Sequence, residues 1–271
     1  MNSMEQIRYL NGILLEEMPQ YKDQASEVPQ DEVSQRRLLR SLMNLRQPAP
    51  LSRDFLSVQD ALLSAEKEAR GVVDADSLPV IASHPRLVLW QGDMTRLRAD
   101  AIVDADNSAL LGCFCPCHGC IDNAIHSAAG LQLREECNRI MTAQGRPEPP
   151  GQAKATGAYN LPSRLILHTV GPVVHGEPSP QDCELLVSCY RSCLNLADQL
   201  QASSVAFCCI STGEYRFPNQ LAARLAVNAV KDFLDQTGSE MKVIFNVYKD
   251  KDLAIYRALL GPDHPSEKDA K

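Results

Sequence analysis

The sequence has few aromatic residues, no long apolar run and no excess of positive charge. Aromatic residues make up 5% of the 271 residues and Trp90 is the single tryptophan, which does not suggest a membrane or carbohydrate-stacking protein. No run approaches about 18 uninterrupted apolar residues, so no membrane-spanning helix is expected. Lys and Arg total 27 against 34 Asp and Glu. The resulting net charge of −7 argues against a general nucleic-acid binder.

The ten cysteines do not indicate a disulfide-bonded secreted protein. The beginning of the chain has no basic segment followed by an apolar core, so we expect no signal peptide. The chain is also long enough to bury a hydrophobic core without disulfides. We therefore expect a cytoplasmic protein with reduced thiols, and we expect a monomer. Six cysteines lie among apolar neighbours and are interpreted as small core residues: Cys137, Cys183, Cys189, Cys193, Cys208 and Cys209.

Helical periodicity dominates the first 80 residues. Apolar residues from Val33 to Leu45 recur at near-helical spacing, and two prolines follow them. A second set, from Phe55 to Ala69, advances in steps of 3, 4, 3 and 4 residues and is followed by Gly71, a typical helix end. Residues 74–79, with the sequence DADSLP, are expected to form a linker.

From about residue 84 the pattern changes to short apolar runs that alternate with amphipathic stretches. The apolar runs predict buried strands at 86–90, 101–105, 164–170, 204–210 and 242–247. The amphipathic stretches predict helices at 122–141, 182–201 and 219–236. This alternation predicts a three-layer α/β/α fold with a parallel or mixed central sheet. Ligands of such folds bind at the carboxyl ends of the strands.

A cluster of metal-ligating residue types follows the strand expected at 101–105. Cys113, His118 and Cys120 form the pattern C-x4-H-x-C, in which one loop can close around one ion. Thiolate and imidazole ligands favour zinc. Three protein ligands leave a position for water or substrate. Alternatives are a closed structural knuckle that uses Cys115 or Cys117 as fourth ligand, or a redox pair of cysteines.

Two further turns follow strands. Ser211, Thr212 and Gly213 come after the strand expected at 204–210, and small residues at such a turn expose backbone N–H groups that can cradle a diphosphate. An ordinary strand-to-helix turn is the alternative. Asp93 follows the first strand of the sheet and can accept a hydrogen bond from an amino group. His126 and His168 lie in apolar periodic stretches, and we interpret both as core residues rather than ligands.

Several of these segments, in this order, resemble macrodomains. They are QGDMT at 91–95, AIVDADNSALLGCFCPCHGCIDNAIH at 101–126, GQAKATGAYNLP at 151–162, LHTVGP at 167–172 and CISTGEYRFP at 209–218. The resemblance covers about residues 84–250 and is closest to the zinc-dependent branch, whose members act as protein ADP-ribose hydrolases and carry a helical N-terminal extension. It implies a helical region at 1–82, a macrodomain with a mixed central sheet at 83–262 and a disordered tail at 263–271.

The resemblance also implies a role for individual residues. Asp93 would bind the adenine amino group, with Met94 nearby, and Asn107 would place the distal ribose. One zinc ion per chain would be held by Cys113, His118 and Cys120. Ile121 and Asp122 would line the distal ribose, and Asp122 would position a water molecule or act as a base, so that Asn107 and Asp122 are the candidate catalytic residues. The phosphate loop would comprise Ser211, Thr212, Gly213, Glu214 and Tyr215.

The sequence departs from the macrodomain pattern at two positions. Macrodomains commonly have N-A-A-N where this chain has Asp104, Ala105, Asp106 and Asn107. Asp104 keeps the acceptor capacity of asparagine and loses its amide donors. Asp106 adds a carboxylate near an anionic ligand, which should weaken binding unless the side chain points away or pairs with a cation.

The resemblance implies a zinc-dependent hydrolase that removes mono-ADP-ribose from acidic side chains of modified proteins. The alternative is a reader module that binds ADP-ribose without turnover and whose zinc is structural. A nucleic-acid-binding zinc knuckle would need basic and aromatic flanking residues. The flanks supply Asp104, Asp106, Asp122 and Phe114 instead. We therefore expect ADP-ribose or a mono-ADP-ribosylated protein as the partner, and neither nucleic acid nor membrane.

Overall fold

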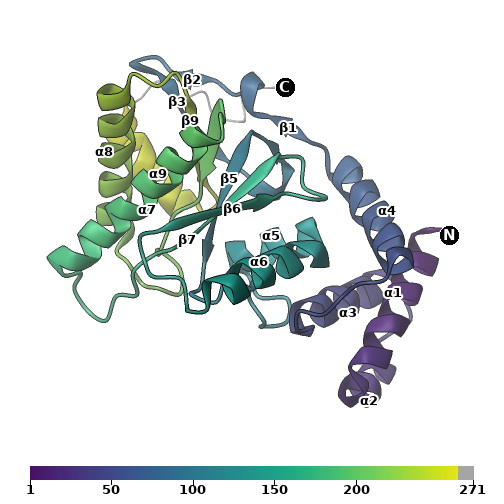
Figure 1. Cartoon of the computed structure of the whole chain (residues 1–271). Helices are drawn as coiled ribbons and strands as arrows, with labels where there is room; N and C mark the ends of the chain where they lie inside the picture. Colours follow the sequence, from purple (N-terminus) through teal and green to yellow (C-terminus); the bar gives the residue numbers. More distant parts are fainter. Residues whose placement is uncertain (262–271) are drawn as a thin grey trace.

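The computed structural model describes residues 1–261, so the tail expected at 263–271 lies outside the described residues. Figure 1 shows a helical N-terminal part beside an α/β part. The α-helices are α1 (Ser3–Glu17), α2 (Lys22–Ser26), α3 (Glu32–Leu45), α4 (Arg53–Arg70), α5 (Ile121–Ala129), α6 (Leu131–Gln144), α7 (Pro180–Gln199), α8 (Asn219–Thr237) and α9 (Asp250–Leu260). The strands are β1 (Val73–Asp74), β2 (Val80–Ile81), β3 (His84–Gln91), β4 (Leu97–Arg98), β5 (Ala101–Asp106), β6 (Ala153–Gly157), β7 (Leu165–Val170), β8 (Ser204–Phe207) and β9 (Lys242–Val247). Short 3-10 helices are η1 (Pro19–Tyr21), η2 (Ala75–Ser77) and η3 (Met94–Arg96).

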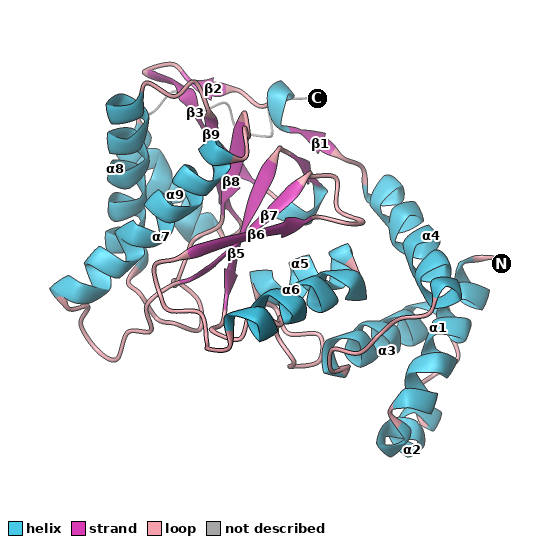
Figure 2. Ribbon diagram, viewed as in Figure 1, coloured by secondary structure: helices cyan, strands magenta, loops and turns pink. Residues whose placement is uncertain are grey.

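The central sheet has seven strands in the order β2-β3-β9-β8-β5-β7-β6. The five inner strands are parallel to their neighbours, whereas β2 and β6 pair antiparallel at the two edges. Helices α5 and α6 lie on one side of the sheet, and α7, α8 and α9 lie on the other (Figure 2). The predicted three-layer α/β/α fold with a mixed sheet is confirmed.

The sequence pattern located the inner strands best, because these are buried on both faces and therefore continuously apolar. The strand at 242–247 matches β9, and β5 ends one residue after its expected end. The strand expected at 204–210 ends at Phe207, because residues 208–217 leave the sheet as a loop. The edge strand β6 was not predicted, since its sequence AKATG has no apolar run. The single helix expected at 122–141 is two helices, broken at Gly130 with φ +100°.

The N-terminal helices have an apolar cluster of their own. Side chains of α1, α3 and α4, among them Leu10, Leu42 and Leu62, pack together with Leu131 of α6. The helix starts are capped by side chains: Asp31 and Ser52 accept from the backbone N–H three residues on in α3 and α4. As predicted, α4 ends at Gly71. The expected linker at 74–79 contains η2, and the following β2 already belongs to the central sheet.

No helix within residues 1–261 has the length and apolarity that a membrane crossing needs.

The parallel strands place several loops at one edge of the sheet. The carboxyl ends of β3, β5 and β8 lie on the same side, so the segments that begin after Gln91, Asp106 and Phe207 emerge together. These segments carry Asp93, Asn107 and the loop of residues 208–217.

Candidate functional site at the carboxyl edge of the sheet

The loop between β5 and α5 brings Cys113, His118 and Cys120 together. Their ligating atoms lie within 4.8 Å of one another, and all three residues are half-buried. Cys113 Sγ lies 3.6 Å from His118 Nδ1. Cys120 is the N-cap of α5, so its sulfur lies at the positive end of the helix and accepts a hydrogen bond from the Asn123 N–H at 3.4 Å. Two sulfurs and one imidazole nitrogen in this arrangement fit a zinc ion.

The other two cysteines of the loop point elsewhere. Cys117 has φ +52° and its sulfur lies 3.3 Å from the Ser41 hydroxyl and 3.6 Å from the Arg37 carbonyl oxygen, both on α3. Cys115 is exposed and is not part of the three-residue group. Neither sulfur is placed as a fourth ligand of the three-residue group. Burial raises the pKa of the Cys120 thiol to about 12, and a bound cation would reverse that effect.

The loop of residues 208–217 lies beside the three-residue group. His118 Nε2 is 3.5 Å from Glu214 Oε1, so the imidazole that offers Nδ1 to a metal meets a carboxylate with its other nitrogen. Within residues 1–261, no acceptor takes the backbone N–H groups of Gly213, Glu214 and Tyr215. Ser211 is buried with φ +63° and its hydroxyl has no partner among the described residues. These features fit an anion-binding loop.

A glycine in the neighbouring segment permits this loop conformation. A Cβ atom on Gly171, directly after β7, would lie 2.0 Å from the Ser211 hydroxyl oxygen and 2.9 Å from Ile210 Cγ2. The two segments therefore approach more closely than any other residue type would allow. The close contact places Ser211 at the carboxyl end of β7 as well as of β8.

Asn107 and Asp122, the two candidate catalytic residues, are in contact. The Asn107 amide donates to the Gly112 carbonyl at 3.2 Å and to Asp122 Oδ2 at 3.4 Å, and its oxygen accepts from the Ala109 N–H. Asp122 is buried in the first turn of α5, next to the half-buried Ile121. Burial, and secondarily the Asp106 carboxylate, raise the pKa of Asp122 well above its usual range.

Asp93 and Met94 occupy the turn after β3. Asp93 Oδ1 accepts from the N–H and hydroxyl of Thr95 at 2.9 and 2.7 Å, and Oδ2 lies 3.3 Å from Arg70 at the end of α4. The Met94 side chain is buried in the main core. The Asp93 side chain is 38% exposed and has a fixed orientation, whereas only the backbone of Met94 is available to a ligand.

Comparison with known proteins identifies the family. The Macro domain family profile matches residues 103–226. A protein from Treponema medium, named protein-ADP-ribose hydrolase, is 47% identical over 96% of this chain and 100% of its own length. The chain belongs to the macrodomain family. A relative from Staphylococcus aureus with the same name is 48% identical over 83% of this chain and 85% of its own length. The crystal structure of a Trypanosoma brucei macrodomain in complex with ADP-ribose is 29% identical, with a TM-score of 0.64, and covers 82% of this chain and 95% of that one.

The two aspartates that depart from the common macrodomain pattern are turned inward. Asp104 is fully buried and Asp106 is 2% exposed. Asp106 Oδ2 lies 3.2 Å from His168 Nδ1, so this carboxylate points away from the carboxyl edge and toward an imidazole. His126 and His168 are buried, as expected, but their ring nitrogens face carboxylates rather than apolar side chains.

Helix α3 of this macrodomain supports the cysteine-bearing loop, which the sequence did not indicate. The Arg40 guanidinium donates to Asn123 Oδ1 at 2.7 Å and to the His118 carbonyl at 3.4 Å. Asn44 is 1% exposed; it accepts from the Cys117 N–H at 2.9 Å and donates to the Ser127 hydroxyl at 3.1 Å. These contacts join residues more than 70 positions apart, so no pattern of neighbouring residues in the sequence could predict them.

Proposed function

We propose that this macrodomain is a zinc-dependent hydrolase that removes mono-ADP-ribose from acidic side chains of modified proteins. The observation that carries the proposal is the convergence of Cys113, His118 and Cys120 at the carboxyl edge, with Cys115 and Cys117 outside the group and with Glu214 of the 208–217 loop against His118. Relatives named protein-ADP-ribose hydrolase at 47% and 48% identity support the reaction class. A related macrodomain crystallised with ADP-ribose supports the ligand.

The proposed binding mode uses residues from three strand ends. Asp93 would accept a hydrogen bond from the adenine amino group, because its carboxylate is partly exposed and held by Thr95 and Arg70. The free N–H groups of Gly213, Glu214 and Tyr215 would cradle the diphosphate. This arrangement lets a protein of net charge −7 bind an anion without a basic patch. Adenine and diphosphate are remote from the scissile bond, so their binding energy would position it.

The bond to be cleaved joins the anomeric carbon of the distal ribose to an acidic side chain. A zinc ion held by Cys113, His118 and Cys120 would supply a Lewis acid beside that ribose. Asp122 would position the attacking water, since its carboxylate is fixed by the Asn107 amide. Asn107 would in turn place the ribose. Glu214 would keep the His118 ring oriented with Nδ1 toward the metal.

The test is release of ADP-ribose from a protein that carries the modification on glutamate or aspartate. The wild-type chain, Cys120→Ala and Cys115→Ala are compared, each with and without a chelator. Cys115 is the matched control because it lies in the same loop and is exposed. We expect Cys120→Ala and the chelated wild type to lose turnover, and Cys115→Ala to keep it. Full turnover by metal-free Cys120→Ala would contradict zinc dependence. ADP-ribose binding without turnover by the wild type would identify a reader module.

A further inference from the structure

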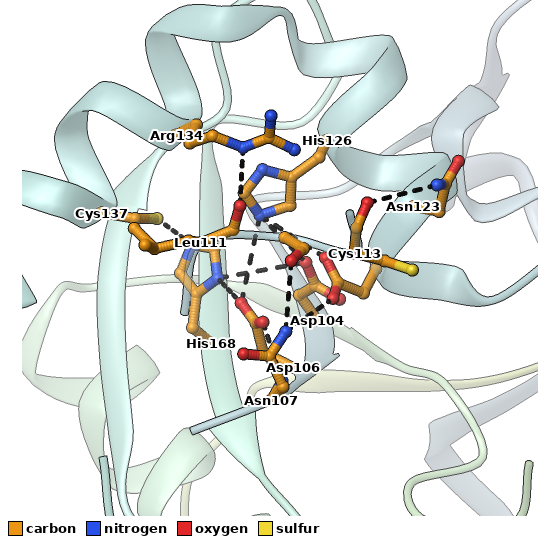
Figure 3. Close-up of polar contacts among 12 residues, drawn as sticks. Asp104, Asp106, Asn107, Leu111, Cys113, Asn123, His126, Arg134, Cys137 and His168 are labelled. Atoms are coloured by element: carbon orange, nitrogen blue, oxygen red, sulfur yellow. Dashed lines mark hydrogen bonds and ion pairs between the residues drawn. The ribbon is translucent and has the colours of Figure 1, made fainter. Parts of the chain in front are cut away.

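A second group of metal-ligating residue types lies beneath the candidate site, between the sheet and α5. Side chains alternate along a strand, so Asp104 and Asp106 share one face of β5, and His168 is the register partner of Asp104 on β7. Helix α5 crosses this face and adds His126, one turn after Asp122. One ligating atom from each of Asp104, Asp106, His126 and His168 lies within 4.8 Å of the others, and all four residues are buried (Figure 3).

Several atoms of this group are buried without hydrogen-bond partners. Both ring nitrogens of His126 and both carboxylate oxygens of Asp104 have no partner among residues 1–261. The His126 side chain is 3% exposed and that of Asp104 is 0% exposed. A buried polar group without a partner costs about 1–3 kcal/mol, and a buried charge costs more. The His126 imidazole and the Asp104 carboxylate face each other without a hydrogen bond, and this arrangement fits an ion bound between them.

The distances fit an ion in that position. His126 Nε2 lies 3.9 Å from Asp104 Oδ2 and 4.0 Å from Asp106 Oδ2. His168 Nδ1 lies 4.0 Å from Asp104 Oδ2 and 3.2 Å from Asp106 Oδ2. Zinc binds nitrogen and oxygen at about 2.0–2.2 Å, so ligand atoms around one tetrahedral ion are about 3.3–3.6 Å apart. Three of the four spacings, at 3.9–4.0 Å, are somewhat longer than this and exceed a direct hydrogen bond, and the fourth, at 3.2 Å, is slightly shorter.

The charge of the group also calls for a cation. Asp104, Asp106 and Asp122 place three carboxyl groups in this interior, and the positive group nearby, Arg134, uses its guanidinium elsewhere. Arg134 donates to the backbone carbonyls of Leu111, Met43, Asn44 and Arg46.

We propose that Asp104, Asp106, His126 and His168 form a second, buried site for a divalent transition-metal cation such as zinc, separate from the Cys113–His118–Cys120 site. Two imidazoles and two carboxylates are ligands that zinc accepts. His168 would bind through Nδ1, because its Nε2 lies 2.9 Å from the Thr156 hydroxyl, which then accepts the ring N–H. The site also accounts for the inward Asp104, since the cation would supply the partner that both of its carboxylate oxygens lack.

The experiment counts metal ions per chain by elemental analysis. The full chain, free of any affinity tag, is stripped with a chelator, reloaded with excess Zn²⁺ and desalted. We expect two ions for the wild type and for the control Cys115→Ser. We expect one ion for the double variant C113S/C120S, which lacks the loop ligands, and one for D104N/D106A. The latter has the residues that macrodomains commonly carry at these positions, so we expect it to fold, and circular dichroism checks this.

A C113S/C120S variant that retains no zinc would overturn the proposal, as would two ions in folded D104N/D106A. Reloading C113S/C120S with Co²⁺ tests the ligand set, because Cys137 lies near His168 and His126 and is the alternative ligand. We expect no thiolate-to-cobalt charge-transfer band. A band that disappears in C113S/C120S/C137S would assign the ion to Cys137 and would contradict the carboxylate site. None of these measurements depends on hydrolase activity, so they stand or fail independently of the proposed function.

Discussion

His118 Nε2 and Glu214 Oε1 lie 3.5 Å apart and connect two loops that follow different strands of the sheet. His118 belongs to the cysteine-bearing loop after β5, and Glu214 to the loop after β8. His118 Nδ1 faces Cys113 and would be the nitrogen that binds the proposed zinc ion, so Glu214 meets the opposite side of the ring. One carboxylate thus links the proposed zinc site to the proposed diphosphate site, and this position was expected only as part of the phosphate loop.

Replacing Glu214 with alanine should weaken zinc binding at the loop site. Partners that orient a ligating histidine typically contribute about 10–100-fold in metal affinity or activity. The Glu214 side chain is 75% exposed, which screens the interaction, so we expect a loss near tenfold. Competition with a chromophoric chelator measures it. Glu177→Ala is the matched control, because Glu177 is an exposed loop glutamate, and an equal loss in both variants would show that the effect is not specific to His118.

Replacing Gly171 with alanine should displace the 208–217 loop. The added Cβ would overlap the Ser211 hydroxyl at 2.0 Å and press on Ile210 at 2.9 Å. We expect a destabilisation of about 1–3 kcal/mol, as for other overpacked positions, together with weaker ADP-ribose binding measured by calorimetry. Gly12→Ala is the control, because no atom lies within 4 Å of its added Cβ.

The double variant G171A/S211A separates steric displacement from a general loss of stability. Removing the Ser211 hydroxyl relieves the shortest contact and leaves the one to Ile210. We therefore expect partial recovery of stability and of ADP-ribose affinity relative to Gly171→Ala alone, which is a coupling of the kind that contacting residues show. If the effects of the two substitutions on the free energy of unfolding simply added, the close approach of residues 171 and 211 would not determine the loop conformation.

The parts of the site that sequence could predict are those set by local spacing. Cys113, His118 and Cys120 are close in the chain, so a single loop brings them together, and the turn at Ser211 directly follows a strand. The spacing did not exclude Cys115 or Cys117 as ligands. Cys117 is directed away by Ser41 and Arg37 of α3, a contact across more than 70 residues. Tertiary packing, not the motif, keeps the Cys117 sulfur out of the three-residue group.

The buried group of acids and histidines shows a different limit of prediction. The sequence AIVDAD predicts a strand, and period-2 alternation places Asp104 and Asp106 on one face. The apolar surroundings of His126 and His168 indicated burial correctly. What the sequence could not show is that β5 and β7 are neighbours, with His168 opposite Asp104, and that α5 covers this face. Strand order is a long-range property, so the convergence emerges only in the fold.

Helix α3 should contribute to metal binding although it carries none of the proposed ligands. Arg40 donates to Asn123 and to the His118 carbonyl. Asn44, which is 1% exposed, accepts a hydrogen bond from the Cys117 N–H. We expect Asn44→Ala to remove the partner of the half-buried Cys117 N–H and of the buried Ser127 hydroxyl, and to destabilise the protein by about 1–3 kcal/mol in urea unfolding. We expect Arg40→Ala to weaken zinc binding at the loop site by about tenfold, because the loop loses its outer support.

The matched control is Arg37→Ala, since the Arg37 side chain is exposed and the group that meets Cys117 is its backbone carbonyl, which the substitution keeps. Zinc affinity of this variant should equal that of the wild type. If Arg40→Ala also binds zinc with wild-type affinity in the same chelator competition, then α3 merely packs on the macrodomain. A selective loss in Arg40→Ala, with unchanged circular dichroism, would instead show that the N-terminal helices hold the loop in the conformation that binds the metal.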